Sequence, residues 1–206
     1  MEAGHVRMNP VRPRDLTLQD LATRWWRPVT AVLLVAAAVV WRLVKNDLGA
    51  PPNLEFSTFA AFAAAGLLRH RLAALAPLAV VALSDVVLGN SWIFVFTWSA
   101  WLLIGLGALW TRRSTGARRV ATSLMFGAGS SIGFYLWTNF GVWLQGRGTF
   151  YPAGLDGLLA SYAAGLPFLR TMLIGNLVLL PLAAGLLSLV ERFERAHAVS
   201  TAPVRA

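Results

Sequence analysis

Apolar runs follow one another along this chain, and they restrict it to a helical fold that spans a membrane. They cover residues 29–44, 54–68, 72–88, 92–110, 120–143 and 166–190. A helix needs about 20 mostly apolar residues to cross a bilayer, and in lipid only helices and closed barrels satisfy their own backbone polar groups. Charged residues make up only 13% of the chain, against about 25% in soluble domains. The sequence therefore predicts an all-α polytopic membrane protein with six transmembrane helices in a compact bundle.

Lysine and arginine are distributed unevenly over the loops that separate these runs. With the N-terminus inside the cell, fourteen of the eighteen lysines and arginines fall on the cytoplasmic side. Cytoplasmic loops are enriched in these residues, so we expect both termini in the cytoplasm of a bacterium and the chain in its inner membrane. The net charge of +9 is then a topology signal. No basic and aromatic recognition motif accompanies it, so nucleic-acid binding is not expected.

The polar ends of the chain flank a single membrane domain. Residues 1–28 are predicted to be a cytoplasmic tail, residues 29–190 the six-helix domain and residues 191–206 a polar cytoplasmic tail. Within the first tail, Leu18, Leu21 and Trp25 follow helical spacing beside Arg24 and Arg27. This pattern fits an amphipathic helix at the membrane surface and equally fits a frayed extension.

Several kinds of chemistry are poorly supported by the residues present. The chain has no cysteine, which removes thiolate metal sites and cysteine nucleophiles. Its three histidines lie in the tails or in a short loop, and neither a nucleophile with its base nor a phosphate-binding loop is visible. We therefore expect no catalytic residues, no metal site and no cofactor. Energy for any uphill transport must come from a partner or an ion gradient.

Polar and aromatic residues from four separate places in the sequence are predicted to meet at the outer face. The stretch 130–170 joins two apolar segments through Asn, Gly, Pro and aromatic residues, as the mouth of a small-molecule site would. The predicted topology brings it together with the ends of the second and third runs. Convergent polar groups with aromatic walls are typical of a ligand pocket. The candidate substrate-binding residues are Asn53, Glu55, Asp85, Asn139, Trp143 and Tyr151.

Each candidate also has a structural interpretation, and the sequence leaves both open. Glu55 is placed to cap the second helix, and Asp85 could pair with Arg170 or a backbone amide. Asn139 could form a hydrogen bond between helices. Trp143 suits an interfacial aromatic belt, and Tyr151 with Pro152 suits a loop turn.

Four runs carry a resemblance to a known family: PPNLEFSTFAAFAAAGLL, LAPLAVVALSDVVLG, FYLWTNFGVWL and YPAGLDGLLASYAAGLPFLRTMLIGN. They resemble an uncharacterised bacterial family of proteins assigned to membrane transport. That family is similar to the substrate-capture (S) subunits of energy-coupling-factor (ECF) transporters. The resemblance implies a pocket closed by the loops after the first, third and fifth helices, formed by the six residues above. It also implies docking on a transmembrane coupling subunit with two cytoplasmic ATPases.

One feature departs from the S-subunit pattern. Those subunits often carry small residues four apart on their first helix for docking. Here the centre of the first run lacks such a pair, and small residues recur four apart on the second run, as Ala60 with Ala64 and Ala61 with Ala65.

Three functional hypotheses follow. The leading one is a non-catalytic, substrate-binding membrane subunit of an uptake system for a vitamin, a cofactor precursor or a metal ion. The alternatives are an accessory or scaffold subunit of a larger complex, and a membrane enzyme using Glu55 and Asp85 on a lipid-linked substrate.

Overall fold

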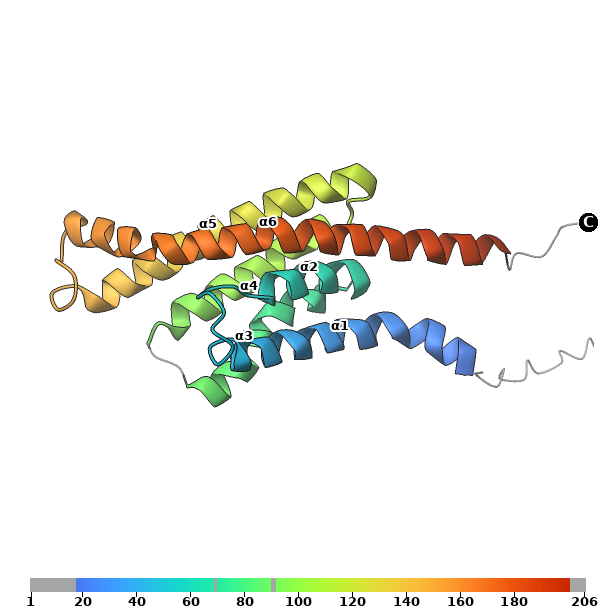
Figure 1. The fold of residues 1–206 in the computed structure, drawn as a ribbon, viewed down its shortest axis with the longest axis horizontal. Helices are drawn as coiled ribbons and strands as arrows, with labels where there is room; N and C mark the ends of the chain where they lie inside the picture. The colour runs from blue at the N-terminus through green and yellow to red at the C-terminus, as the bar shows by residue number, and fades with distance from the viewer. Residues whose placement is uncertain (1–17, 69, 90–91, 201–206) are drawn as a thin grey trace, which may run out of the picture.

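The helices of this protein pack into one bundle, with a long helical hairpin along one side (Figure 1). The computed structural model describes residues 18–68, 70–89 and 92–200. Within this part of the chain the elements are α1 (Leu18–Val44), α2 (Ser57–Leu68), the 3₁₀ helix η1 (Arg71–Leu75), α3 (Ala76–Leu88), α4 (Phe94–Thr111), α5 (Gly116–Gly146) and α6 (Leu155–Ser200). The six α-helices confirm the predicted fold class.

Four of these helices include segments long and apolar enough to cross a membrane. These segments are Thr23–Val44, Arg71–Leu88, Phe94–Thr111 and Leu155–Ala196. The window in Leu155–Ala196 is only 22% buried inside the protein, so most of its apolar side chains face outward. Such a surface suits lipid and would be an aggregation hazard in water.

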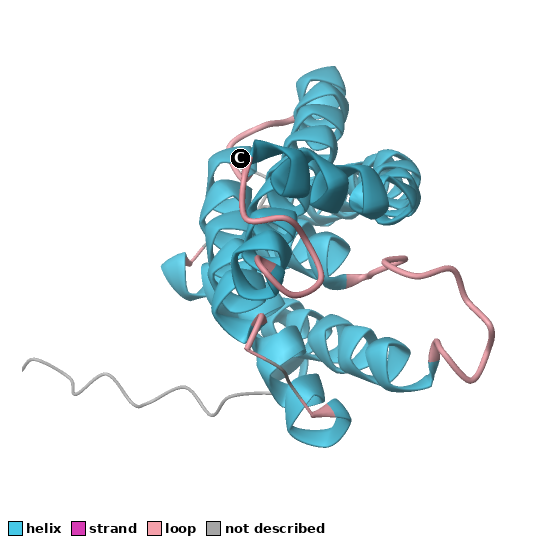
Figure 2. Cartoon of the chain, turned by 90° about the vertical axis from the view of Figure 1, so that its left-hand side faces the viewer, coloured by secondary structure: helices cyan, strands magenta, loops and turns pink. Residues whose placement is uncertain are grey.

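Both ends of the described chain lie at the same end of the bundle (Figure 1). An ion pair between Arg27 of α1 and Glu194 of α6 ties them together. The C-terminal ends of α1, α3 and α5 point to the opposite end, onto which Figure 2 looks. This arrangement agrees with the predicted connectivity. That the first end faces the cytoplasm stays a prediction.

Several helices are longer than the apolar runs indicated. The predicted boundary at residue 28 falls inside α1, because Leu18–Val44 is one continuous helix with Pro28 within it. Likewise α6 begins at Leu155 rather than 166, contains Pro167 and Pro181, and continues to Ser200. The stretch 130–170 is therefore mostly helical, with a short turn between Gly146 and Leu155. Residues 1–17 and 201–206 lie outside the described part.

The short helix α2 occupies the centre of the bundle. Nine of its twelve residues are buried, among them Ala60, Ala61, Ala64 and Ala65. Small side chains allow neighbouring helices to approach closely without leaving cavities. Because these alanines are covered by the protein's own helices, they form no exposed docking surface for a partner.

The long helices α5 and α6 lie antiparallel and side by side (Figure 1). Asn176 of α6 is fully buried and donates a hydrogen bond to Ser131 Oγ of α5 at 2.9 Å. Nearby, a Cβ atom at Gly127 would lie 3.3 Å from the backbone oxygen of Asn176. The hairpin that joins the two helices extends beyond the other helices at its end of the bundle (Figure 1).

Candidate functional site

A polar cavity of about 790 Å³ lies at the end of the bundle reached by the C-terminal ends of α1 and α3. Four charged side chains line it: Arg42, Lys45, Glu55 and Asp85. Trp101 of α4 and Phe134 of α5 add an aromatic surface. The amides of Asn46 and Asn53 also line it. Seven of the thirteen described residues that line it are charged or polar, so the cavity is more polar than the mainly apolar pockets that bind drug-sized ligands.

The guanidinium group of Arg42 organises the charges. Its Nε donates to Ser84 Oγ at 2.7 Å, its Nη1 to Glu55 Oε1 at 3.2 Å, and its Nη2 to Asp85 Oδ1 at 3.1 Å. Lys45 Nζ also donates to Glu55 Oε1, at 2.5 Å. Two cations thus face two carboxylates. The mutual pairing explains how four ionisable groups are tolerated near membrane depth.

Local structure brings these groups together. Arg42 lies in the last turn of α1, where a long cationic side chain can reach the bundle end. Asp85 lies in the last turn of α3, and the indole Nε1 of Trp98 donates to its Oδ2 at 2.9 Å. Trp41 Nε1 donates to the carbonyl oxygen of Leu54 at 2.8 Å. This bond holds the segment before α2 against α1.

Glu55 is the most buried of the four charged groups, with its side chain 6% exposed. Its Oε1 accepts from both Arg42 and Lys45, whereas its Oε2 is buried and has no hydrogen-bond partner among the described residues. The hydroxyls of Ser57 and Thr58, in the first turn of α2, are likewise buried without a partner. Buried polar atoms of this kind are costly unless something pairs with them. Of the three, only Glu55 lines the cavity, so its Oε2 retains hydrogen-bonding capacity there.

Three of the six candidate residues, Asn53, Glu55 and Asp85, therefore converge on one cavity. Asn53 has a φ of +61°, a left-handed conformation that asparagine tolerates better than most residues. The partner of Asp85 is Arg42 rather than Arg170, whose exposed side chain lines a separate apolar cavity beside α6.

The other three candidates lie in the α5–α6 hairpin and are not among the residues that line this cavity. Asn139 Nδ2 donates to Tyr135 O at 2.9 Å, and its amide packs where a Cβ at Gly165 would fall. Trp143 Nε1 donates to Pro152 O at 3.1 Å. The backbone N–H of Tyr151 donates to Gly146 O at 3.0 Å in the turn. These contacts hold the hairpin together, and a ligand-binding role for the three residues stays a prediction.

Sequence reasoning missed several residues that form the cavity. From the sequence alone, Arg42 and Lys45 are only two cations at the end of the first apolar run, where long cationic side chains commonly reach the membrane interface. Nothing in the sequence singles out Trp101 and Phe134, because aromatic residues are frequent along the chain. The same holds for Trp98, which donates to Asp85. One signal for Arg42 was available: the chain places two carboxylates and two of its few outer cations at the ends of neighbouring helices.

The fold and this cavity define a helical membrane protein with a polar cavity at one end of its bundle. A family model described as a family of unknown function, DUF6580, matches residues 22–199. The chain belongs to this family, and the match runs from near the start of α1 to the last turn of α6. Neither the curated proteins nor the solved structures gave a match.

Proposed function

We propose that this protein is the membrane-embedded substrate-binding subunit of a small-molecule uptake system, similar in role to the S subunits of ECF transporters. The polar cavity carries this proposal. Its volume of about 790 Å³ falls within the range of about 300–1,000 Å³ typical of small-molecule sites. Its position at the predicted outer end of the bundle suits capture of a ligand from outside the cell.

The cavity lining suits a ligand that combines a flat or apolar part with polar edges. Trp101 and Phe134 provide aromatic surface for the flat or apolar part of the ligand. Asn46 and Asn53 provide hydrogen-bond donors and acceptors for its polar edges. A vitamin or cofactor precursor fits this combination better than a bare metal ion, because Arg42 and Lys45 already neutralise both carboxylates.

The proposed role is binding without catalysis. The sequence has no phosphate-binding loop, so a coupling subunit with its own ATPases, or an ion gradient, would supply energy. The buried alanines of α2 are covered within the bundle, so a coupling subunit would use another surface.

The test is a thermal-shift screen of the purified full-length protein against vitamins and cofactor precursors. The informative variants are Asn46→Ala and Asn53→Gly, since both residues line the cavity. Glycine retains the positive φ at position 53. We expect either variant to reduce the shift caused by a hit compound, with little change in the melting temperature without ligand.

Asn139→Ala is the matched control, because Asn139 is absent from the cavity lining. We expect it to keep the full ligand response. If Asn139→Ala abolishes the response while the two cavity variants retain it, the ligand binds at the hairpin instead. If no compound shifts the melting temperature, the uptake role is not supported.

The second candidate is an accessory or scaffold subunit. The observation favouring it is that Arg42 ties α1 to α3 and to the segment before α2, so the charges also serve to hold helices together. A scaffold predicts that the protein copurifies with a partner in the absence of ligand, and that both cavity variants leave this complex intact.

A further inference from the structure

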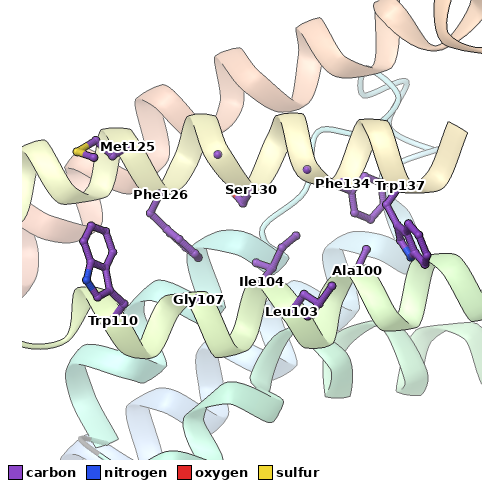
Figure 3. Close-up of a pocket in the computed structure, with 12 residues that line it drawn as sticks. Ala100, Leu103, Ile104, Gly107, Trp110, Met125, Phe126, Ser130, Phe134 and Trp137 are labelled. Carbon is purple, nitrogen blue, oxygen red and sulfur yellow. The ribbon is translucent and has the colours of Figure 1, made fainter. Parts of the chain in front are cut away.

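An apolar groove runs along the outside of the bundle between α4 and α5, apart from the polar cavity. It has a volume of about 510 Å³, and Ala100, Leu103 and Ile104 line its α4 side. Figure 3 shows Trp110 and Met125 at one end and Trp137 at the other. Phe134 is the one described residue that lines both this groove and the polar cavity.

Small residues keep the groove open. Gly107 lies on its α4 side, and Gly129 and Gly133 lie on its α5 side. A Cβ atom at Gly129 or Gly133 would meet no atom within 4 Å. The space above them is therefore unfilled by the protein's own side chains.

A basic cavity of about 520 Å³ continues the groove toward the loop between α4 and α5. Trp110 and Met125 line both spaces. On α5 the shared face proceeds at helical spacing from Arg118 through Thr122 and Met125 to Gly129. The groove and the cavity thus form one continuous channel on the outer surface of the bundle.

The charges in this channel gather at one end. Arg113 and Arg118 both line the basic cavity and are exposed. No carboxylate is among the described residues that line it. The neighbouring Arg119 is turned inward, where it donates to Glu191 Oε1 at 2.7 Å. An anion entering the cavity therefore meets two arginines that face the membrane surface.

We propose that this channel binds an anionic phospholipid. Its phosphate group lies between Arg113 and Arg118, and one acyl chain lies in the apolar groove. Arginine recognises phosphate through paired N–H donors. The groove from Met125 to Trp137 extends about 18 Å along a helix rising about 1.5 Å per residue, slightly more than one leaflet of about 15 Å.

The position of the arginines supports a lipid over a protein partner. They lie at the end of the bundle predicted to face the cytoplasm, where anionic lipids give the leaflet its negative surface potential. A transmembrane helix from a partner would fill the apolar groove, but it would leave the two cationic groups unpaired at the interface.

The test is native mass spectrometry of the full-length protein in a nonionic detergent. The probes are dioleoylphosphatidylglycerol, dioleoylphosphatidylcholine and inorganic phosphate. We expect phosphatidylglycerol to bind more tightly than phosphatidylcholine, and phosphate alone to bind too weakly to detect. Arg113→Gln and Arg118→Gln are each expected to weaken phosphatidylglycerol binding about fivefold, since each basic residue contributes about 1 kcal/mol near an anionic surface.

Two matched controls accompany these variants. Arg192→Gln removes an exposed arginine on α6 that does not line the channel. Gly133→Leu fills the groove, whereas Gly185→Leu adds the same side chain on α6, where a Cβ also meets no atom within 4 Å. We expect Gly133→Leu alone to reduce binding of the dioleoyl lipid, with both leucine variants folded as judged by circular dichroism.

Four results would overturn the proposal. One is equal binding of the two lipids, and another is an equal loss for Arg192→Gln. A third is unchanged lipid binding by Gly133→Leu, because the acyl chain would then lie elsewhere. The fourth is a dimer that Gly133→Leu converts to a monomer with lipid binding unchanged, since the groove would then be a protein interface. If one arginine variant fails to fold, the other decides the question.

Discussion

Arg42 and Asp85 are 43 residues apart in the sequence, and their side chains meet with Nη2 and Oδ1 separated by 3.1 Å. The same guanidinium group also reaches Glu55 and Ser84. The planar fork of arginine can serve three acceptors at once, which the single ammonium group of lysine cannot do with the same geometry. Arg42 thereby fixes the position of α1 relative to α3 and to the start of α2.

Replacing Arg42 with methionine should destabilise the fold strongly. Its side chain is 17% exposed, and its partners Glu55 and Asp85 are 6% and 9% exposed. Replacing Arg42 breaks its buried pair with Asp85 and removes one of the two cations paired with Glu55, since Lys45 remains. Breaking a buried charge pair costs about 3–5 kcal/mol. Unfolding in mixed detergent micelles measures this cost, and Arg42→Lys should lose less because it keeps the charge. An Arg42→Met variant as stable as the wild type would show that the network contributes little.

The indole N–H group of Trp98 should contribute to the stability of the fold. Trp98→Phe keeps most of the ring and removes the donor to Asp85 Oδ2. Leaving a buried acceptor short of a partner costs about 1–3 kcal/mol. The same unfolding measurement applies. Phe94→Leu is the control. Phe94 packs edge-on against the Trp98 ring, and its side chain has no hydrogen-bond donor. Equal losses for the two variants would indicate packing rather than hydrogen bonding.

Hydropathy and loop order account for the part of the site that could be predicted. Apolar runs give the number of helices, and the number of crossings places the ends of α1 and α3 on one side. That reasoning brought Asn53, Glu55 and Asp85 together. The same reasoning could not predict the hydrogen bonds of Arg42, because the direction of its side chain depends on the rotation of α1 about its own axis. That rotation is set by how α1 packs against α2 and α3.

The sequence also did not show how far the α5–α6 hairpin extends along the bundle axis. Asn139, Trp143 and Tyr151 belong to a hairpin whose helices are 31 and 46 residues long, well beyond a span of about 20 residues. The last apolar run begins at residue 166, yet α6 begins eleven residues earlier, at Leu155. The number of predicted membrane crossings places the hairpin at the same end of the bundle as the C-terminal ends of α1 and α3. It does not indicate that the hairpin extends beyond the other helices.

Gly105 should not tolerate even a methyl group. A Cβ there would lie 1.8 Å from the backbone oxygen of Ala74 in η1, and a backbone atom cannot move aside as a side chain can. Overpacking typically costs about 1–3 kcal/mol, and we expect Gly105→Ala to reach or exceed the top of that range.

Gly107→Ala on the same helix is the matched control, because its Cβ would lie 3.4 Å from the Phe126 ring. It should be neutral or stabilising by up to about 1 kcal/mol through helix propensity. Similar melting temperatures for both variants would mean that η1 does not approach α4 as closely as described.

Arg119 should contribute as much to the stability of the fold as Arg42 does, but at the opposite end of the bundle from the polar cavity. It is 5% exposed, and it donates to Ser114 O at 2.9 Å, to Ser188 Oγ at 3.1 Å and to Glu191 Oε1 at 2.7 Å. These bonds connect the turn before α5 with α6. Arg119→Met should therefore cost about 3–5 kcal/mol, mainly because the buried pair between Arg119 and Glu191 is broken.

The double variant Arg119→Met with Glu191→Leu separates this cause from lost packing. It removes both charges, so it should recover part of the stability that the single variant loses. The recovery should be incomplete, because Ser114 O and Ser188 Oγ still lose their donor. Arg192→Met changes the next residue along α6, which is exposed, and should alter stability by less than about 0.5 kcal/mol. A double variant that is less stable than Arg119→Met would show that Glu191 stabilises α6 independently of Arg119, and that the charge pair is not what joins the two helices.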